Sequence, residues 1–268
     1  MARHNLSLIA FTSLYCFGLR IWAFTLPGLF ASNYSSSSTS EESSQQHPLS
    51  DQDIRQGTHG AVASESSICS QIGIDILQAG GNAADSMIAT TFCVGVIGMY
   101  HSGIGGGGFA LLRDQNGTYE FIDFRETAPA ASTQDMFVGH VDNATNGGLK
   151  SGVPGELRGL AYIHEHHGSL PWAQLVMPAV RVARHGFPIT EDFVRYTRNT
   201  MAHRGDWITG DPNWSIDFAP NGTLLGLGDT MTRKRYADTL ETIATAGPDA
   251  FYAGPLADAT VDALRAQK

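Results

Sequence analysis

Phe121-Ile-Asp-Phe-Arg-Glu-Thr-Ala-Pro129 is the stretch from which the fold and the site are read. It begins as a short apolar strand and ends in a charged arginine and a proline-limited turn. The guanidinium of Arg125 is a planar fork that can hold a carboxylate through two hydrogen bonds, and it stays charged at any working pH. An arginine beside Asp123 and Glu126 is, however, more often half of a local ion pair. Arg125 is therefore a candidate carboxylate ligand only if the surrounding sequence supports it.

Upstream of this stretch lies a glycine-rich loop followed by two apolar runs. The loop is His101-Ser-Gly-Ile-Gly-Gly-Gly-Gly-Phe109, and the runs cover residues 110–113 and 119–124 with Asn116-Gly117 between them. Two apolar runs joined across Asn-Gly predict a β-hairpin, whose loop can be longer than these two residues. The order along the chain is therefore glycine loop, strand, turn and strand.

The glycine loop also fits a nucleotide-binding pattern, because Gly103 to Gly108 reads G-x-G-x-x-G. That pattern normally follows a strand and opens a helix whose N-terminus holds pyrophosphate. Here the preceding segment has a helical pattern and the following one is extended. No lysine followed by serine or threonine closes the loop, so it is not a P-loop either. We predict that the glycines permit close backbone approach and that the chain binds no cofactor.

Three motifs resemble those of the γ-glutamyltranspeptidase family, the glutathione hydrolases. They are Gly103-Ile-Gly-Gly-Gly-Gly-Phe109, Asp123-Phe-Arg-Glu-Thr-Ala-Pro-Ala130 and Gly152-Val-Pro-Gly-Glu-Leu-Arg-Gly159. Four further segments stand in the family's order, namely Gly80-Gly-Asn-Ala-Ala-Asp85, Gly168-Ser-Leu-Pro-Trp172, Ala183-Arg-His-Gly-Phe-Pro188 and Gly247-Pro-Asp-Ala-Phe-Tyr252. The resemblance runs from about Gly57 to the C-terminus.

The resemblance implies an α+β fold, the four-layer αββα sandwich of N-terminal-nucleophile hydrolases, of which this chain supplies an incomplete, large-subunit portion. Proteins of this family cut themselves and expose a threonine at the new N-terminus of a small subunit. The implied donors are glutathione and other γ-glutamyl compounds, and the acceptors are water, amino acids or dipeptides. Arg125 maps to the arginine that binds the α-carboxylate of the γ-glutamyl group, and Glu126 is a candidate to orient it.

The threonine nucleophile of such an enzyme is expected beyond Lys268, in the small subunit. The nearest doublet in this chain, Thr90-Thr91, lies in the apolar helical pattern from Ala83 to Val96, which is typical of a packed helix. We therefore predict no catalytic residue here and no activity for this chain alone. Two hypotheses remain: the substrate-binding large-subunit portion of a hydrolase and transferase, or a truncated non-catalytic secreted glycoprotein. Hydrolysis versus transpeptidation and the physiological donor stay open.

The first 56 residues differ from the rest. Residues 1–31 are predicted to be a signal peptide or a signal anchor, and Arg20, which interrupts the apolar run, favours cleavage over membrane anchoring. Residues 32–56 are rich in serine, glutamine and glutamate and predict a flexible stalk. Residues 57–268 form the truncated large-subunit domain. These features predict entry into the secretory pathway and an extracellular, cell-surface or vacuolar location.

Two further features bear on that location. Sequons at Asn33, Asn116, Asn143, Asn213 and Asn221 would be open to glycosylation in the secretory pathway. Cys16 lies in the targeting segment, whereas Cys69 and Cys93 lie on helical apolar patterns and are expected to be buried free thiols. One disulfide between the last two is an alternative that the sequence leaves open.

The charged residues argue against two other classes of function. The net charge of −9 disfavours a nucleic-acid partner. The basic run Arg233-Lys-Arg235 is expected to form the solvated side of an amphipathic helix. A zinc motif at His164-Glu-His-His167 would need a further histidine at position 168, where glycine stands, so no metal site is predicted. Glu156 and Arg158 are candidates for a structural ion pair.

Helix ends are marked clearly enough to place the motifs. We predict that Ser64 caps a helix that runs to Ala79 and that Asn82 caps the next. Pro154 suits the first turn of a third helix. A fourth helix is predicted over Trp172 to His185, where a glycine follows.

Overall fold

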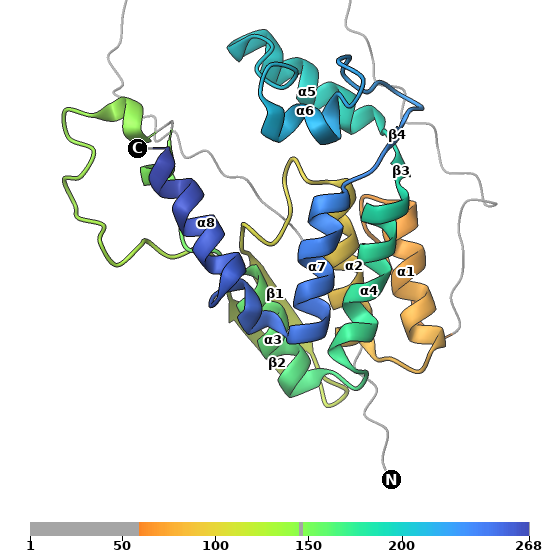
Figure 1. The fold of residues 1–268 in the computed structure, drawn as a ribbon. Coiled ribbons are helices and arrows are strands. Elements are labelled where there is room, and N and C mark those ends of the chain that lie inside the picture. The colour runs from red at the N-terminus through yellow and green to blue at the C-terminus, as the bar shows by residue number, and fades with distance from the viewer. Residues whose placement is uncertain (1–58, 145–146, 268) are drawn as a thin grey trace, which may run out of the picture. The chain divides into compact units, whose positions relative to one another are not determined.

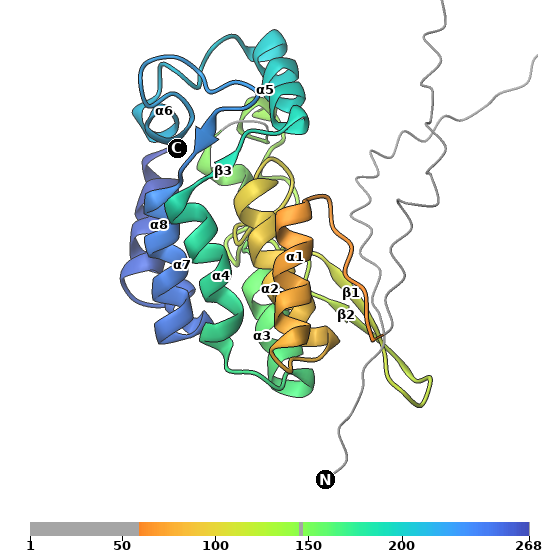
Figure 2. The ribbon, with the colours of Figure 1, turned by 90° about the vertical axis from the view of Figure 1, so that its right-hand side faces the viewer.

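Helix α2, Ala83–Ile97, lies among the other helices of the computed structural model, which describes residues 59–144 and 147–267. Twelve of its fifteen residues are buried, as expected of a helix that is apolar on all sides. It packs between α1, Ser67–Gln78, and α4, Trp172–His185, and α4 packs in turn against α7, Lys234–Ala246. Figures 1 and 2 show these four helices side by side. The predicted leader, 1–31, and stalk, 32–56, lie outside the described residues.

The helix caps decide where α1 and α2 begin. Asn82 caps α2 as predicted, and its side chain and that of Asp85 exchange hydrogen bonds with each other's backbone N–H at 3.1 and 3.0 Å. The prediction of Ser64 as the cap of α1 is wrong, because the side chain of Ser66 accepts the bond from the N–H of Cys69. The hydroxyl of Ser64 bonds the backbone oxygen of Ser66 instead, at 2.9 Å. Both serines satisfy the capping preference, so local sequence did not separate them.

A disulfide joins α1 to α2. Cys69 and Cys93 are both fully buried, their Cα atoms lie 5.3 Å apart, and their sulfurs are bonded. The expectation of free thiols is therefore wrong. The apolar periodicity correctly placed each cysteine on a buried face, but it carried no information on which faces meet.

The predicted β-hairpin is confirmed. Strands β1, Phe109–Arg113, and β2, Tyr119–Asp123, pair antiparallel with Leu111 opposite Phe121. The loop between them is longer than Asn-Gly, because the N–H of Asp114 bonds the carbonyl of Thr118 at 3.0 Å. One face of the hairpin buries alanine and leucine side chains, whereas the other leaves four large apolar side chains exposed, those of Phe109, Leu111, Tyr119 and Phe121.

The remaining elements complete a mixed α and β architecture. Helix α4 has the predicted bounds, whereas Pro154 lies before α3 rather than in its first turn, because Gly155 occupies the cap position. A second two-stranded sheet pairs β3 with β4, and α5 and α6 lie beyond it at one end of the four helices (Figures 1 and 2). The other elements are α3 Glu156–His167, β3 Phe187–Pro188, α5 Glu191–Arg204, α6 Pro212–Phe218, β4 Thr230–Met231 and α8 Pro255–Ala266, with 3-10 turns η1 Val141–Ala144, η2 Gly148–Lys150 and η3 Pro248–Phe251.

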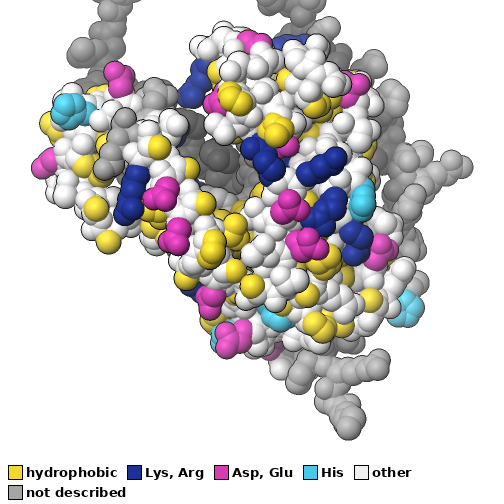
Figure 3. Space-filling model, in the orientation of Figure 1, with side chains coloured by type: hydrophobic (Ala, Val, Ile, Leu, Met, Phe, Trp, Pro, Cys, Tyr) yellow, Lys and Arg dark blue, Asp and Glu magenta, His cyan; other side chains and the backbone are white. Residues whose placement is uncertain are grey.

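The surface over α4 and α7 mixes the two signs of charge. Figure 3 shows basic and acidic side chains next to one another on this face. Arg184 on α4 pairs with Asp238 and Glu241 on α7, at 2.5 and 3.0 Å.

None of the helices in the ranges 59–144 and 147–267 combines the length and the apolar character that a membrane span requires.

Loss of the disulfide should destabilise the α1–α2 pair. The bond closes a segment with a sequence separation of 24, and a loop of that size stabilises a fold by about 3 kcal/mol through the unfolded state. We expect Cys69→Ala with Cys93→Ala to lower the free energy of unfolding by about this amount in urea titrations. Reducing agent should destabilise the unmodified chain and leave the double variant unchanged. Equal sensitivity of both proteins to reductant would contradict the pairing.

Candidate functional site

Arg125 stands directly after β2 and points its guanidinium toward solvent. Its side chain is 61% exposed, and its Nε donates to Oε2 of Glu126 at 2.7 Å. Its backbone N–H bonds the carboxylate of Asp123 at 3.0 Å. Among the described residues no acceptor binds its two terminal NH2 groups. Arg125 therefore forms the local ion pair through Nε alone, and this pair leaves both terminal NH2 groups available to a ligand.

The glycine loop ties the end of β2 to the start of α3. Gly108 and Phe124 exchange two backbone hydrogen bonds, at 3.0 and 3.3 Å, which continue the antiparallel pairing past the hairpin. The carbonyl of Gly106 accepts the N–H groups of Gly155 and Glu156 at 2.9 and 3.0 Å. Those two N–H groups stand at the N-terminus of α3, where helical partners are lacking. One loop thus positions both the arginine-bearing segment and the helix.

Close contact with Phe124 explains three of the glycines. A Cβ on Gly107 would strike the carbonyl oxygen of Phe124 and would lie 3.0 Å from the carbonyl carbon of Arg125. A Cβ on Gly155 would strike the same oxygen, and one on Gly159 would strike the Phe124 ring. These glycines are needed because there is no room for a side chain, as the sequence predicted for the loop.

Glu156 is buried beside this loop. It is 4% exposed, and the N–H of Gly103 bonds its carboxyl group. Its Oε1 has no hydrogen-bond partner within the ranges 59–144 and 147–267. Burial raises the pKa of Glu156 to about 7, the negative charge of Glu126 also raises it, and the bond from Gly103 opposes the shift. The predicted pair with Arg158 is wrong, because Arg158 pairs with Asp249.

A second buried group lies where α7 begins. Arg233 donates from one NH2 group to the carbonyls of Gly95 and Val96, both at 3.1 Å, and its guanidinium lies 4.1 Å from the ring centre of Tyr236. Burial lowers the pKa of Arg233. Burial also raises the pKa of Tyr236 to about 12, although the charge of Arg233 and a hydrogen bond from the backbone of Ile104 oppose that rise. The prediction of a solvated basic run is therefore wrong for Arg233.

The histidines and threonines singled out by sequence have structural contacts. His164 bonds the carbonyl of Leu170 and His167 bonds the carboxylate of Glu120, each at 2.8 Å. The described ranges contain no set of three or more His, Cys, Asp or Glu side chains that would hold a metal ion. Thr90 is buried in α2 with its hydroxyl on the carbonyl of Ser86, which confirms the prediction of a packed helix.

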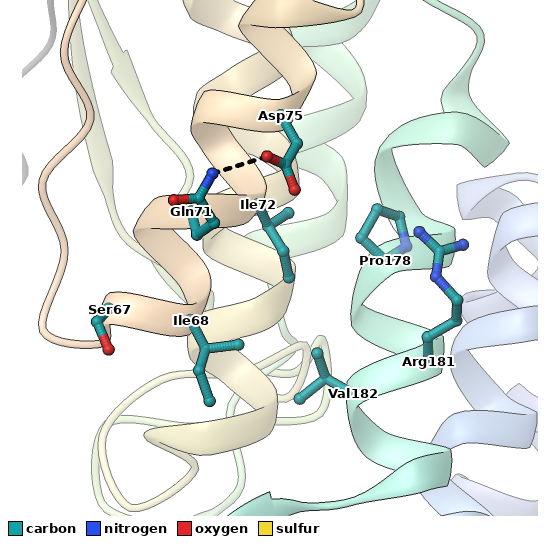
Figure 4. Close-up of a pocket in the computed structure, with 8 residues that line it drawn as sticks. All are labelled: Ser67, Ile68, Gln71, Ile72, Asp75, Pro178, Arg181 and Val182. Atoms are coloured by element: carbon teal, nitrogen blue, oxygen red, sulfur yellow. Dashed lines mark hydrogen bonds between the residues drawn. The ribbon is translucent and has the colours of Figure 1, made fainter. Parts of the chain in front are cut away.

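A pocket of about 510 Å³ lies between α1 and α4, away from the candidate residues. Figure 4 shows its apolar floor and, on opposite walls, Asp75 and Arg181. Gln71 bonds Asp75 at 2.8 Å. Neither Arg125 nor any residue of the glycine loop lines it. The pocket is therefore separate from the candidate carboxylate ligand Arg125.

Sequence reasoning missed the burial of Glu156 and Arg233. A signal existed for Arg233, because an arginine three residues before Tyr236 lies over the same helical face and can stack on its ring. For Glu156 the only signal was its place at a helix start after a proline and a glycine. Its burial depends on a loop about fifty residues upstream, which local sequence does not reveal.

The chain is similar to known proteins in both sequence and structure. The family model described as Gamma-glutamyltranspeptidase matches residues 69–268. The "Glutathione hydrolase" of Aspergillus flavus is 54% identical over 207 residues, which cover 77% of this chain and 34% of that protein. The "Glutathione hydrolase proenzyme" of Arthroderma benhamiae is 53% identical over 221 residues, covering 78% and 38%. The chain thus spans little more than a third of the length of these curated relatives.

A solved structure of the same family is also similar to this chain. The γ-glutamyltranspeptidase from Pseudomonas nitroreducens, complexed with L-DON, is 33% identical and superposes with a TM-score of 0.69. The match covers 78% of this chain and 61% of that chain. The expected fold class is confirmed in this sense: the mixed helices and strands described above form part of the fold of these hydrolases.

Two alanine substitutions in one loop test the packing around Phe124. Gly107→Ala should displace the segment that carries Arg125 and lower the free energy of unfolding by about 1–3 kcal/mol, because the new Cβ meets backbone atoms that cannot move alone. Gly105→Ala is the matched control, since a Cβ there meets nothing within 4 Å. Thermal and urea unfolding measure both. Equal stability of the two variants would show that the loop does not lie against Phe124.

Proposed function

Because this chain belongs to the γ-glutamyltranspeptidase family, we propose that residues 59–267 are the substrate-binding large-subunit portion of an enzyme that cleaves and transfers γ-glutamyl groups. The observation that carries the proposal is the open fork of Arg125 at the end of β2. Its terminal NH2 groups match the geometry of a carboxylate, and Glu126 holds Nε in place.

The proposed substrates are glutathione and other γ-glutamyl compounds. Two curated relatives bear the name glutathione hydrolase, and they are more than half identical to this chain where they match. Arg125 would bind the α-carboxylate of the γ-glutamyl group and so place its γ-carbonyl at a fixed distance from the arginine. Positioning of this kind lowers the barrier by avoiding the loss of rotational freedom during the reaction.

The chemical step would use a threonine outside this chain. Its hydroxyl attacks the γ-carbonyl carbon while its own amine takes the proton, the amide C–N bond breaks, and the amine product leaves with that proton. Water, an amino acid or a dipeptide then attacks the resulting ester and releases the threonine. The relatives called proenzymes support processing of a longer precursor into two subunits.

The exposed face of the hairpin is the proposed contact with the small subunit. Phe109, Leu111, Tyr119 and Phe121 are 47–64% exposed, and the two phenylalanine rings stack at 5.7 Å. An apolar patch of this kind on a sheet face marks a surface that another element covers. Burial of this face by the small subunit would bring the partner beside Arg125, which follows the same strand.

The secretory pathway is the proposed location, with the mature protein extracellular, at the cell surface or vacuolar. The Cys69–Cys93 disulfide supports an oxidising compartment. Four of the sequon asparagines, Asn116, Asn143, Asn213 and Asn221, lie in the described ranges and are all exposed. We expect a glycosidase that removes N-linked glycans to lower the mass of the protein secreted by a eukaryotic host. An unchanged mass would contradict glycosylation.

Replacement of Arg125 tests the proposed substrate site. In the two-subunit enzyme that contains this chain, Arg125→Ala should raise KM for γ-glutamyl donors at least tenfold, because a charge-assisted bidentate contact is lost, and such bonds contribute about 1.5–3 kcal/mol. Arg125→Lys should recover only part of the loss, since an ammonium cannot form the fork. Arg113→Ala, on the same hairpin, is the control and should leave KM unchanged. An unchanged KM in Arg125→Ala would overturn the assignment.

The chain by itself should not turn over substrate. We expect no release of a chromogenic amine from a γ-glutamyl anilide by residues 1–268 alone, and release once the small subunit is supplied from the same precursor. Turnover by the isolated chain would place the nucleophile within it. Absence of any open reading frame for a small subunit would favour the truncated, non-catalytic glycoprotein instead.

A further inference from the structure

Glu156 is a buried carboxyl group that the proposed function does not use. It is the first residue of α3, and it touches the glycine loop twice: its backbone N–H donates to Gly106, and its side chain accepts from Gly103. Its burial and the unpaired Oε1 leave it without a compensating cation in the described ranges. An uncompensated buried carboxylate costs free energy, so this group responds to its surroundings by taking up a proton.

Glu126 links this carboxyl group to Arg125. One oxygen of Glu126 accepts Nε of Arg125 at 2.7 Å, while the other faces the glycine loop, where a Cβ on Gly106 would lie 3.3 Å from it. The charge of Glu126 also acts on Glu156 and disfavours its ionisation. Both carboxyl groups therefore lie at the glycine loop, that of Glu156 at Gly103 and that of Glu126 at Gly106, and the latter is bound to the arginine.

The other charged and titratable groups around Glu156 do not neutralise it. The charged end of Arg233 is bonded to the carbonyls of Gly95 and Val96. Tyr236 on α7 and Tyr252 after η3 both interact with Glu156, and its negative charge adds to the burial that raises their pKa values. Arg158, on the same helix, is exposed and paired with Asp249. Ionisation of Glu156 thus adds a net negative charge at the glycine loop, beside Glu126, which binds Nε of Arg125.

We propose that Glu156 is a positioning residue whose ionisation weakens the binding of a carboxylate at Arg125. The identity of that ligand as a γ-glutamyl compound rests on the function proposed above. A second negative charge beside Glu126 opposes an incoming anion and draws the guanidinium toward the protein. By linkage, a bound carboxylate must in turn favour the protonated form of Glu156. Binding should then be tighter when Glu156 is protonated.

The sign of the pH dependence follows directly. Because burial raises the pKa of Glu156 to about 7, the group is mostly protonated at about pH 6 and mostly ionised at about pH 8. In the two-subunit enzyme we expect KM for a γ-glutamyl donor to rise about 3- to 10-fold between these values, with little change in kcat. Glu156→Gln should keep KM low and flat across this range. Glu165→Gln, an exposed carboxyl on the same helix, is the control and should behave as the unmodified enzyme.

Several outcomes would overturn the proposal. A KM of the unmodified enzyme that does not change between about pH 6 and 8 would overturn the proposal, whether or not the variants fold. A rise in KM that persists in Glu156→Gln would assign the effect to another group. If Arg125→Ala leaves KM unchanged, the proposed substrate site is wrong. A second measurement then still tests whether ionisation of Glu156 affects Arg125.

That measurement is the NMR signal of the Arg125 Nε–H group in residues 1–268. We expect it to shift with a midpoint of about pH 7 and to lose that shift in Glu156→Gln but not in Glu165→Gln. A signal that does not respond between about pH 6 and 8 would disprove the coupling, even if Arg125 binds substrate.

Discussion

The close approach of three backbone segments around Phe124 is the constraint on which the rest of the site depends. The glycine loop, the end of β2 and the start of α3 meet without room for a Cβ at Gly107, Gly155 or Gly159. The carbonyl of Gly106 accepts two backbone N–H groups at the start of α3, and Gly108 exchanges two backbone hydrogen bonds with Phe124, so these bonds hold the three segments together. At Gly107 and Gly155 the atoms in contact belong to the backbone, and at Gly159 they belong to the Phe124 ring, so a side chain at these positions would force the packed segments apart. The side chain of Arg125 extends from this junction with its terminal NH2 groups toward solvent.

The helices α1, α2 and α7 are linked to one another and to the glycine loop of this junction. The disulfide holds α1 on α2, and Arg233 ties the start of α7 to the last turn of α2 through the carbonyls of Gly95 and Val96. The chain leaves α2 and enters the glycine loop a few residues later, and Tyr236 on α7 contacts that loop at Ile104. A buried polar group such as Arg233 is expensive unless it is bonded, so its two bonds also specify how α7 docks.

The features that depend on neighbours in sequence were predictable. The hairpin follows from two apolar runs around Asn-Gly, the cap at Asn82 from a capping box, and the bounds of α4 from its apolar face and the glycine after His185. The features that were missed depend on segments far apart. The bond between Cys69 and Cys93 and the burial of Glu156 require knowing which helix faces meet, and periodicity gives a face without giving its partner. The proposed role of Arg125 was inferred from its chemistry and from the family motifs, and the structure adds that its side chain is exposed and bound to Glu126 through Nε alone.

In the function proposed above, this chain presents the guanidinium of Arg125 from the backbone junction around Phe124, and the reacting threonine comes from outside the chain. The most direct measurement is a crystal structure of the two-subunit enzyme with a γ-glutamyl ligand bound. We predict both α-carboxylate oxygens at about 3 Å from the guanidinium nitrogens of Arg125, with Glu126 still on Nε. An α-carboxylate held by another cation, with the terminal NH2 groups of Arg125 still facing solvent, would contradict the central claim.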